Sequence, residues 1–406
     1  MYLTRKLEQK LLNLSASFPV VMVTGARQVG KTTMLKQIGK GMGFVSLDIP
    51  DNRVFANEEP AAFLAKHKPP VIIDEFQYAP KLLHYIKAYV DETKRYGDFW
   101  LTGSQTFASM ENVAESLAGR VGIVNLFSFS QSELSGVLFD EYTADIDSLI
   151  KRQKQTAAVN KSETFKKILK GGMPRVHEDT PATVQDYFDS YFQTYLSRDI
   201  RNLAQVADEL SFYKFMQVCG LLAAEQVDYA KISNRAGITA AKAKHWVSVL
   251  VSSGIAILLP PYFNNALKRV VKTPKLYFMD SGLLCYLRGI QNAEVLEKLS
   301  GSGVFFENFV VSEIYKSFAN AGMRPPLFFY RDTSGNNEID LIIEQNGMCH
   351  PIEIKESTNP DKNAAKHFGV LAATGGMPVG TGSVICNSQE IYPVGKNIWA
   401  VPHWVV

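Results

Sequence analysis

Apolar residues occur in short uninterrupted runs along the first third of the chain, and each run ends at glycine or polar residues. The runs cover residues 20–23, 71–73 and 99–101, and another follows Arg120. Such runs are typical of strands that are buried on both faces of a parallel sheet. A helix-like segment follows the first run. The pattern predicts an α/β fold with a doubly wound parallel sheet.

The turn after the first run has the sequence GARQVGKT at residues 25–32, which matches the pattern GxxxxGK(S/T) in full. Glycines allow successive backbone N–H groups to point at a phosphate, and a strand before and a helix after the turn argue against a chance glycine-rich loop. The motif predicts ATP bound with Mg²⁺, with Lys31 at the β- and γ-phosphates and Thr32 as a magnesium ligand. The residues expected to bind the nucleotide are Gly25, Ala26, Arg27, Gln28, Val29, Gly30, Lys31, Thr32 and Thr33.

Two carboxylates end the second run, where a parallel strand would bring them to the phosphate turn. We expect Asp74 to lie beside Mg²⁺ and Glu75 to activate the attacking water. The third run ends at Gly103 and Ser104, and Ser104 would lie between the phosphate turn and the acidic pair as a sensor of the γ-phosphate. A charged strand end is the alternative for the acidic pair.

Arg120 lies between a helix-like stretch and the fourth apolar run. There it would reach the γ-phosphate of a neighbouring copy in a homo-oligomer and stabilise charge in the transition state. An ordinary surface arginine explains the same position equally well.

The strings GARQVGKT, VIIDE, LTGSQ and LAGRV, in this order and spacing, resemble the AAA+-type P-loop ATPases of bacteria and archaea that end in a DUF4143-type, nuclease-like region. The resemblance implies that GGMP at residues 171–174 places Pro174 against the nucleotide base. It also marks YLSRDI at residues 195–200 as a helical signature. Without the resemblance, GGMP indicates only a loop.

The length and composition of the chain favour several domains, and its net charge does not indicate a particular class of binding partner. The 406 residues are 46% hydrophobic and 20% charged, and the net charge of +3 is too small to indicate a nucleic-acid binder by itself. Four distant cysteines lack metal or disulfide spacing, and the start lacks the apolar core of a signal peptide, which favours the cytoplasm. Residues 246–263 are apolar but interrupted below membrane-spanning length. We expect no membrane partner.

Four domains are expected: a P-loop ATPase domain (1–140), a linker and helical lid (141–207), a winged helix (208–289) and an α+β, restriction-endonuclease-like domain (290–406).

Residues 228–252 have the spacing of a helix-turn-helix, with Gly237 in the turn. Strand-like segments at 255–259 and 275–279 enclose a loop with Lys268, Arg269 and Lys272, which would form a wing. Lys242, Lys244 and His245 fall early on the second helix, where DNA would be met. A packing or partner-docking module is the alternative, because a few lysines on a helix usually form a solvated face.

The dipeptide Asn346-Gly347 is a strong hairpin signal in the last part of the chain. A two-residue turn there sets Asp340 opposite Glu353 and Lys355 opposite Glu338, all on one face of the hairpin. The Cβ atoms of Asp340 and Glu353 would lie about 5 Å apart. Two like charges at that distance indicate a divalent cation between them, either Mg²⁺ or Mn²⁺.

Lys355 would orient a water-derived nucleophile that attacks a phosphodiester. The arrangement resembles the PD-(D/E)xK nuclease core, which implies a further carboxylate ligand from a preceding helix, Glu307 rather than Glu313. The proline often found before the aspartate is absent. An exposed hairpin with a Glu338–Lys355 pair is the alternative, and Arg331 would either contact phosphate or neutralise the acidic face.

These features together predict a Mg²⁺-dependent ATPase that controls action on nucleic acid, with metal-dependent cleavage as a further activity. The nucleic acid expected is DNA, as a duplex or a junction. A second hypothesis is a nucleotide-dependent signalling switch whose C-terminal domains bind partners without cutting nucleic acid. A third is a toxin-like nuclease that the ATPase restrains.

Overall fold

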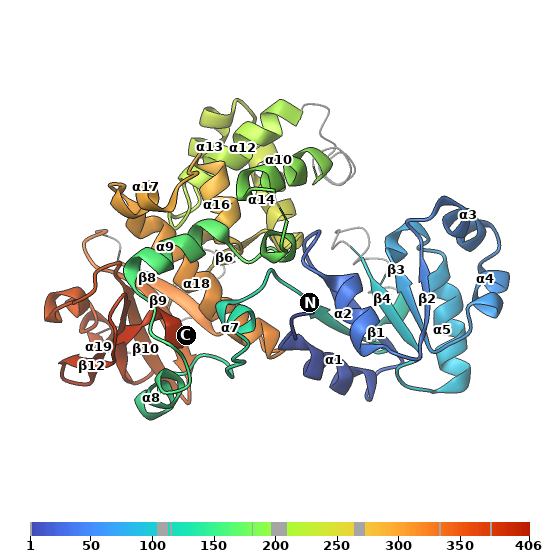
Figure 1. The fold of residues 1–406 in the computed structure, drawn as a ribbon, viewed down its shortest axis with the longest axis horizontal. Helices are drawn as coiled ribbons and strands as arrows, with labels where there is room; N and C mark the ends of the chain where they lie inside the picture. The colour runs from blue at the N-terminus through green and yellow to red at the C-terminus, as the bar shows by residue number, and fades with distance from the viewer. Residues whose placement is uncertain are drawn as a thin grey trace. The chain divides into compact units, whose positions relative to one another are not determined.

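A parallel sheet of five strands in the order β2-β3-β4-β1-β5 forms the centre of the N-terminal unit (Figure 1). Every neighbouring pair in it is parallel, as the apolar runs predict. β4 lies between β1 and β3, so the strand that ends at Thr102 separates the phosphate turn from the acidic pair. The strands are β1 (Val20–Thr24), β2 (Gly43–Ser46), β3 (Val71–Asp74), β4 (Phe99–Thr102) and β5 (Val121–Asn125).

The computed structural model describes residues 2–103, 113, 116–180, 182–195, 209–263, 273–332, 334–373 and 376–406. These residues divide into two units, one made mainly of the residues up to 129 and the other mainly of those from 130 onward. The predicted boundaries at 207 and 289 lie inside the second unit, and the finer division into domains stays a prediction.

Buried side chains on both faces of the sheet explain the uninterrupted apolar runs. All residues of β1, β3 and β4 are buried. Ile86 and Val90 pack against this core from one of the surrounding helices. The helices are α1 (Leu7–Ser15), α2 (Lys31–Ile38), α3 (Pro50–Glu58), α4 (Pro60–Lys66) and α5 (Leu82–Thr93), with a short 3-10 helix η1 (Phe76–Tyr78) after β3.

Helices dominate the first part of the second unit. Those before the predicted helix-turn-helix are α7 (Gln131–Ser135), α8 (Ile146–Gln153), α9 (Lys161–Lys170), η2 (Pro174–His177) and α10 (Val184–Tyr195). The next are α12 (Glu209–Leu221), α13 (Tyr229–Ala236), α14 (Ala240–Ser252), α16 (Ser281–Leu287) and α17 (Ala293–Lys298).

Gly237 ends α13 in the left-handed conformation, with φ of 70°, and α14 begins three residues later, so the two helices have the predicted spacing. β6 (Ala256–Leu259) and β7 (Lys275–Phe278) form an antiparallel pair. The wing residues Lys268, Arg269 and Lys272 lie outside the described residues. Lys244 and His245 are exposed on α14, whereas the Lys242 ammonium lies 4.6 Å from the centre of the Trp246 ring. The assignment as a winged helix stays a prediction.

The C-terminal part contains a mixed sheet of six strands in the order β12-β13-β11-β10-β9-β8. β9 and β10 form the predicted hairpin, and Asn346 and Gly347 have positive φ angles of 54° and 73°. The strands are β8 (Leu327–Arg331), β9 (Glu338–Gln345), β10 (Met348–Ile354), β11 (Gly382–Cys386), β12 (Tyr392–Gly395) and β13 (Ile398–Pro402). The long helix α18 (Ser302–Asn320) precedes them, and the short helices η4 (Lys362–Ala365), α19 (Val370–Ala373) and η5 (His403–Val405) complete the chain.

All four cysteines are buried and have the thiol form, and burial raises the thiol pKa of Cys219 and of Cys285. Within the part of the chain that the structure describes, each helix is too short or too polar to cross a membrane.

Candidate nucleotide site and acidic cluster

The phosphate turn after β1 has the backbone that the glycines were expected to allow. Gly25, Gln28 and Gly30 have positive φ angles of 137°, 62° and 96°. A Cβ on Gly25 would overlap the carbonyl oxygen of Leu126, so only glycine fits there. α2 begins directly after Gly30, which puts the N-terminus of a helix at the turn.

Lys31 is 6% exposed, and its ammonium lies within the phosphate turn. Nζ donates hydrogen bonds of 2.9 Å to the carbonyl oxygens of Gly25 and Ala26. The charge is therefore held beside the backbone that would surround a phosphate.

Asp74, at the end of β3, joins the phosphate turn to the ends of the two neighbouring strands, β2 and β4. Its Oδ1 accepts hydrogen bonds from the Thr32 hydroxyl at 2.6 Å and from the Thr102 hydroxyl at 2.9 Å, and its Oδ2 accepts one from Ser46 at 3.2 Å. Thr32 and Asp74 were expected together. Ser46 and Thr102 were not identified as site residues from the sequence. Thr102 directly follows the third apolar run, and Ser46 ends β2, which was not predicted. Hydroxyl and carboxylate oxygens are suitable ligands for Mg²⁺.

Glu75 follows β3 with a left-handed backbone, at φ of 57°, and its side chain accepts a hydrogen bond from the Gln77 amide. Burial raises the pKa of Glu75, and the positive charge of Lys31 opposes this rise. A carboxylate with a raised pKa is suited to accept a proton from water. Ser104, the expected γ-phosphate sensor, lies outside the described residues.

Arg120 lies beside the amino-terminal end of β1, whereas its own phosphate turn follows the carboxyl-terminal end of that strand. Its carbonyl accepts a hydrogen bond from the Val20 N–H at the start of β1, and the five residues of β1, at about 3.3 Å each, separate that point from Gly25. The guanidinium binds the Asp91 carboxylate of α5 at 2.5 and 3.0 Å. Action on a nucleotide would thus require a neighbouring copy, and this role stays a prediction.

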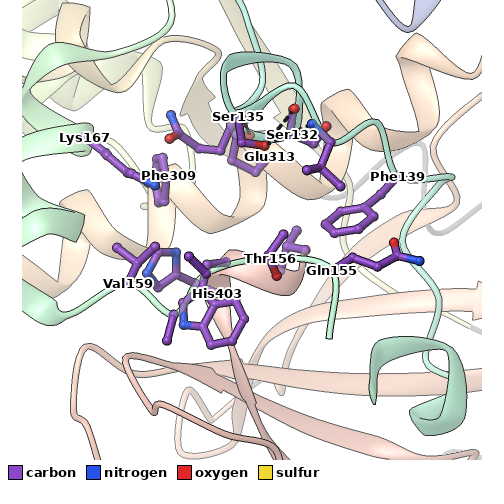
Figure 2. Close-up of a pocket in the computed structure, with 16 residues that line it drawn as sticks. Ser132, Ser135, Phe139, Gln155, Thr156, Val159, Lys167, Phe309, Glu313 and His403 are labelled. Carbon is purple, nitrogen blue, oxygen red and sulfur yellow. Dashed lines mark hydrogen bonds between the residues drawn. The ribbon is translucent and has the colours of Figure 1, made fainter. Parts of the chain in front are cut away.

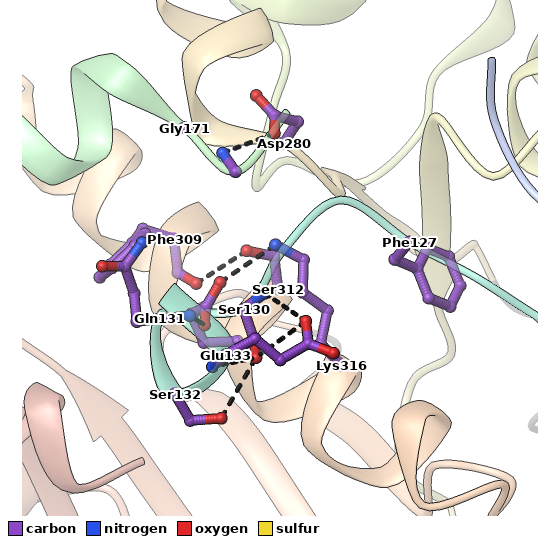
Figure 3. Close-up of polar contacts among 12 residues, drawn as sticks. Phe127, Ser130, Gln131, Ser132, Glu133, Gly171, Asp280, Phe309, Ser312 and Lys316 are labelled. Carbon is purple, nitrogen blue, oxygen red and sulfur yellow. Dashed lines mark hydrogen bonds and ion pairs between the residues drawn. The ribbon is translucent and has the colours of Figure 1, made fainter. Parts of the chain in front are cut away.

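The GGMP turn packs against the start of α16 in the second unit. Gly172 N–H donates to Asp280 Oδ2 at 2.9 Å, and a Cβ on Gly171 would overlap the Asp280 carboxylate (Figure 3). The close approach of Asp280 therefore explains the glycine at position 171 by packing. The contact of Pro174 with the nucleotide stays a prediction, and residues 196–200 of YLSRDI are outside the described range.

The hairpin register brings Asp340 and Glu353 together as expected. The pairs run from Met348–Gln345 to Ile352–Leu341, and the next position in this register joins Asp340 to Glu353. Asp340 Oδ2 also accepts a hydrogen bond of 2.9 Å from the Ile354 N–H. Both carboxylates are buried, which argues against an exposed hairpin.

The lysine partners in this cluster differ from the Glu338–Lys355 pair of the alternative interpretation. Lys355 Nζ lies 2.6 Å from Glu353 Oε1 and 3.9 Å from Asp340 Oδ2. Glu338 instead pairs with Lys275 of β7 at 2.6 Å, and Arg331 lies 3.8 Å from Glu338. Sequence reasoning missed Lys275, which enters from a segment more than 60 residues earlier.

Glu307 is the helix carboxylate that joins the cluster. Its Oε1 accepts a hydrogen bond of 2.7 Å from the Tyr277 hydroxyl and lies 3.5 Å from Lys275 Nζ. Glu313 binds elsewhere: it accepts the Gln131 N–H at 2.6 Å and pairs with Lys316 at 3.0 Å (Figure 3). The preference for Glu307 is consistent with these contacts.

The cluster holds carboxylates that are crowded and poorly solvated. Burial raises the pKa of Glu307 to about 7, and Lys275 opposes the rise. Burial and the charge of Asp340 raise the pKa of Glu353 to about 8. Glu353 Oε2 is buried and has no hydrogen-bond partner among the described residues. A carboxylate oxygen in this state is suited to a bound cation.

These residues fit a divalent cation in their chemistry, since they offer carboxylate oxygens. Within the described ranges, however, no group of three or more His, Cys, Asp or Glu side chains has the arrangement of a formed metal site. The expected metal ligands Glu307, Asp340 and Glu353 therefore stay a prediction.

The second unit contains a cavity of about 280 Å³ (Figure 2). Its lining includes Phe309, Lys167, Glu313 and His403. The His403 ring shares a hydrogen bond of 2.8 Å with the Thr164 hydroxyl. Burial and, to a smaller extent, the charge of Lys167 lower the pKa of His403 to about 3. His403 is therefore a neutral packing residue in the folded chain.

Three parts of the chain match known families. Residues 17–135 match an AAA domain (AAA_14), residues 162–294 match a domain of unknown function (DUF8612), and residues 302–405 match another domain of unknown function (DUF4143). The chain thus contains an AAA-type P-loop ATPase domain followed by a C-terminal DUF4143 domain.

Two relatives, uncharacterized proteins of Mycobacterium tuberculosis and Mycobacterium bovis, are each 26% identical to this chain over 391 residues, which cover 95% of this chain and 80% of theirs. Among solved structures, a Walker-type ATPase of Pyrococcus abyssi is similar with a TM-score of 0.44 and 14% identity, over 71% of this chain and 96% of that one.

The low pKa of His403 predicts a loss of stability in mild acid. An unfolded histidine titrates near pH 6.5, so the unfolded chain takes up this proton first as the pH falls. The contribution of His403 to the free energy of unfolding should decrease from pH 7 to pH 5, so over this range the free energy of unfolding should change less favourably in the parent than in His403→Gln. Denaturant unfolding at both pH values measures the effect. His245→Gln, at an exposed position, is the control, and an equal change in the parent and in His403→Gln would contradict the prediction.

Proposed function

We propose that this chain is a Mg²⁺-dependent ATPase that uses ATP binding and hydrolysis to control action on nucleic acid. The observation that carries the ATPase part is the 2.6 Å hydrogen bond between Thr32 and Asp74. It joins the phosphate turn to the acidic strand end, and a magnesium site for ATP requires these two oxygen ligands side by side.

The residues of the first unit have separate tasks in this proposal. Lys31 binds the β- and γ-phosphate oxygens, while Thr32 and Asp74 hold Mg²⁺. Magnesium, when bound with ATP, neutralises negative charge on the phosphates. Glu75 accepts the proton of the attacking water, and its burial and raised pKa support that role.

The second unit supplies the contact with nucleic acid in this proposal. Lys244 and His245 are exposed on α14, at the positions where a helix-turn-helix meets DNA. The acidic cluster around Asp340 and Glu353 holds a divalent cation, and Lys355 orients the water that attacks a phosphodiester.

A nucleotide-dependent switch without cleavage is the second candidate. It is favoured by the ion pairs of Lys275 with Glu338 and of Lys355 with Glu353, both at 2.6 Å, because these ammonium groups already compensate part of the acidic charge. Stimulation of ATP turnover by DNA favours the first function over the switch. Cleavage that occurs only without ATP would favour a nuclease that the ATPase restrains.

The nucleotide site is tested by separating binding from hydrolysis. Lys31→Ala should lose most ATP affinity because the phosphates lose their cation. Glu75→Gln should bind ATP normally and hydrolyse it about 10²- to 10⁴-fold more slowly. A fluorescent ATP analogue measures binding, and phosphate release measures turnover. Lys36→Ala, at an exposed position on the same helix, is the control. Unchanged affinity in Lys31→Ala would rule out the proposed role of the phosphate turn.

Arg120 is tested by removing either the arginine or its partner. Arg120→Ala should bind ATP but turn it over slowly, whereas Asp91→Asn, which leaves the arginine in place, should keep turnover. Mixing Arg120→Ala with Glu75→Gln should restore part of the activity, because mixed oligomers contain one intact site. Full ATPase activity of a monomeric parent at high dilution would contradict action between copies.

The acidic cluster is tested by metal binding and by cleavage. Asp340→Asn and Glu353→Gln should each weaken Mn²⁺ binding by at least about tenfold. Lys355→Ala should keep the metal and lose cleavage, and all three variants should keep ATP turnover. Calorimetry measures Mn²⁺ binding, and labelled single-stranded and duplex DNA and RNA, with and without ATP, report cleavage.

Glu344→Gln provides the matched carboxylate control on the same hairpin. If the parent chain binds no divalent cation in calorimetry, the metal site is wrong and the switch becomes the better description.

A further inference from the structure

Two side chains of β7 reach into the acidic cluster from outside the C-terminal sheet. Lys275 and Tyr277 are two residues apart and so point to the same side of the strand. The Tyr277 hydroxyl donates to Glu307 Oε1 at 2.7 Å, and Lys275 Nζ lies 2.6 Å from Glu338 Oε1 and 3.5 Å from Glu307 Oε1. The Lys275 ammonium thus forms ion pairs with both Glu307 and Glu338.

The position of this ammonium is fixed by the packing of β7 against α18. The Phe278 N–H donates to Asn308 Oδ1 at 2.8 Å, and Asn308 Nδ2 donates to the Phe278 carbonyl at 2.9 Å. Asn308 is fully buried and directly follows Glu307. Lys275 is only 3% exposed, and the surrounding contacts leave its ammonium little freedom to move away.

The other side of the cluster lacks such a fixed cation. The Lys355 side chain is 44% exposed, and it pairs with Glu353 Oε1 while Glu353 Oε2 has no partner among the described residues. The Glu353 side chain is 9% exposed, so water does not readily replace a missing partner. Glu307 uses Oε1 for both Lys275 and Tyr277.

We propose that Lys275 takes the place of a second metal ion in the acidic cluster, so that the cluster binds one divalent cation on the side of Asp340 and Glu353. The inference rests on the proposed function of this cluster as a metal site. Lys275 is a positioning residue: it holds Glu307 and Glu338 in place and occupies the position between them that another cation would need.

The number of bound Mn²⁺ ions tests this inference on the full chain without nucleotide. Electron paramagnetic resonance reports free Mn²⁺ during a titration, and the double variant Asp340→Asn/Glu353→Gln gives the background from other sites. The parent should bind one Mn²⁺ above this background. Lys275→Met should bind two, because Glu307 and Glu338 become available as ligands.

Three further variants make the count specific. Lys275→Met/Glu338→Gln should return to one Mn²⁺, since the second position loses a carboxylate. Lys275→Arg should also bind one, because it restores a fixed positive charge. Lys316→Met is the matched control: Lys316 is equally buried and pairs with Glu313 outside the cluster, so its loss should leave the count at one.

Two Mn²⁺ ions bound by the parent above the background of the double variant would overturn the inference, and this comparison does not depend on the folding of Lys275→Met. One ion with unchanged affinity in a folded Lys275→Met, checked by circular dichroism and ATP turnover, would overturn it while the proposed metal site stands. No specific Mn²⁺ in the parent would refute the metal site and this inference together, while the ATPase assays would still report on the first unit.

Discussion

A buried carboxylate needs hydrogen bonds or an opposing charge, and both candidate sites of this chain are organised by that requirement. Asp74 is 7% exposed and is satisfied by hydroxyl groups from three separate segments. Glu353 is equally buried, but only one of its oxygens has a partner. The first arrangement is complete in the protein alone, whereas the second calls for a further cation.

This difference accounts for the electrostatics of the two regions. Neutral hydroxyl donors surround Asp74, and in the proposed function this carboxylate also binds the magnesium ion that accompanies the nucleotide. In the acidic cluster, Lys275 pairs with Glu307 and Glu338, and Lys355 pairs with Asp340 and Glu353. The pKa of Glu307 is raised to about 7 and that of Glu353 to about 8. Charges that are this close repel each other unless a cation lies between them. In the function proposed above, the cation is a divalent metal ion, and Lys275 would limit how many such ions the cluster accepts.

The contacts of β7 also bear on how the second unit works as a whole. Lys275, Tyr277 and the backbone of Phe278 hold α18 through Glu307 and Asn308. The strand belongs to the same antiparallel pair that follows α14, the helix expected to meet DNA. Movement of β7 would therefore shift the Lys275 ammonium and the Tyr277 hydroxyl relative to Glu307 and Glu338.

Short-range patterns in the sequence determined much of this protein. The phosphate turn follows from glycines and Lys31 at fixed spacing, and Asn346-Gly347 set a register in which Asp340 meets Glu353. Both depend on the backbone geometry of neighbouring residues, so they can be derived from the chain alone. The helix carboxylate Glu307 came from resemblance to a known arrangement, and its contacts agree with that choice.

Only the tertiary structure decided which distant residues complete each site. Ser46 and Thr102 bind Asp74 because their strands lie beside β3. Lys275 is the partner of Glu338, in place of the Lys355 of the alternative interpretation, because β7 packs on α18. Because β1 and β5 are parallel, Arg120, which precedes β5, lies beside the start of β1, and the phosphate turn lies beyond its end. Strand order and helix packing bring together segments that are far apart along the chain, and local sequence patterns carry no information about that pairing.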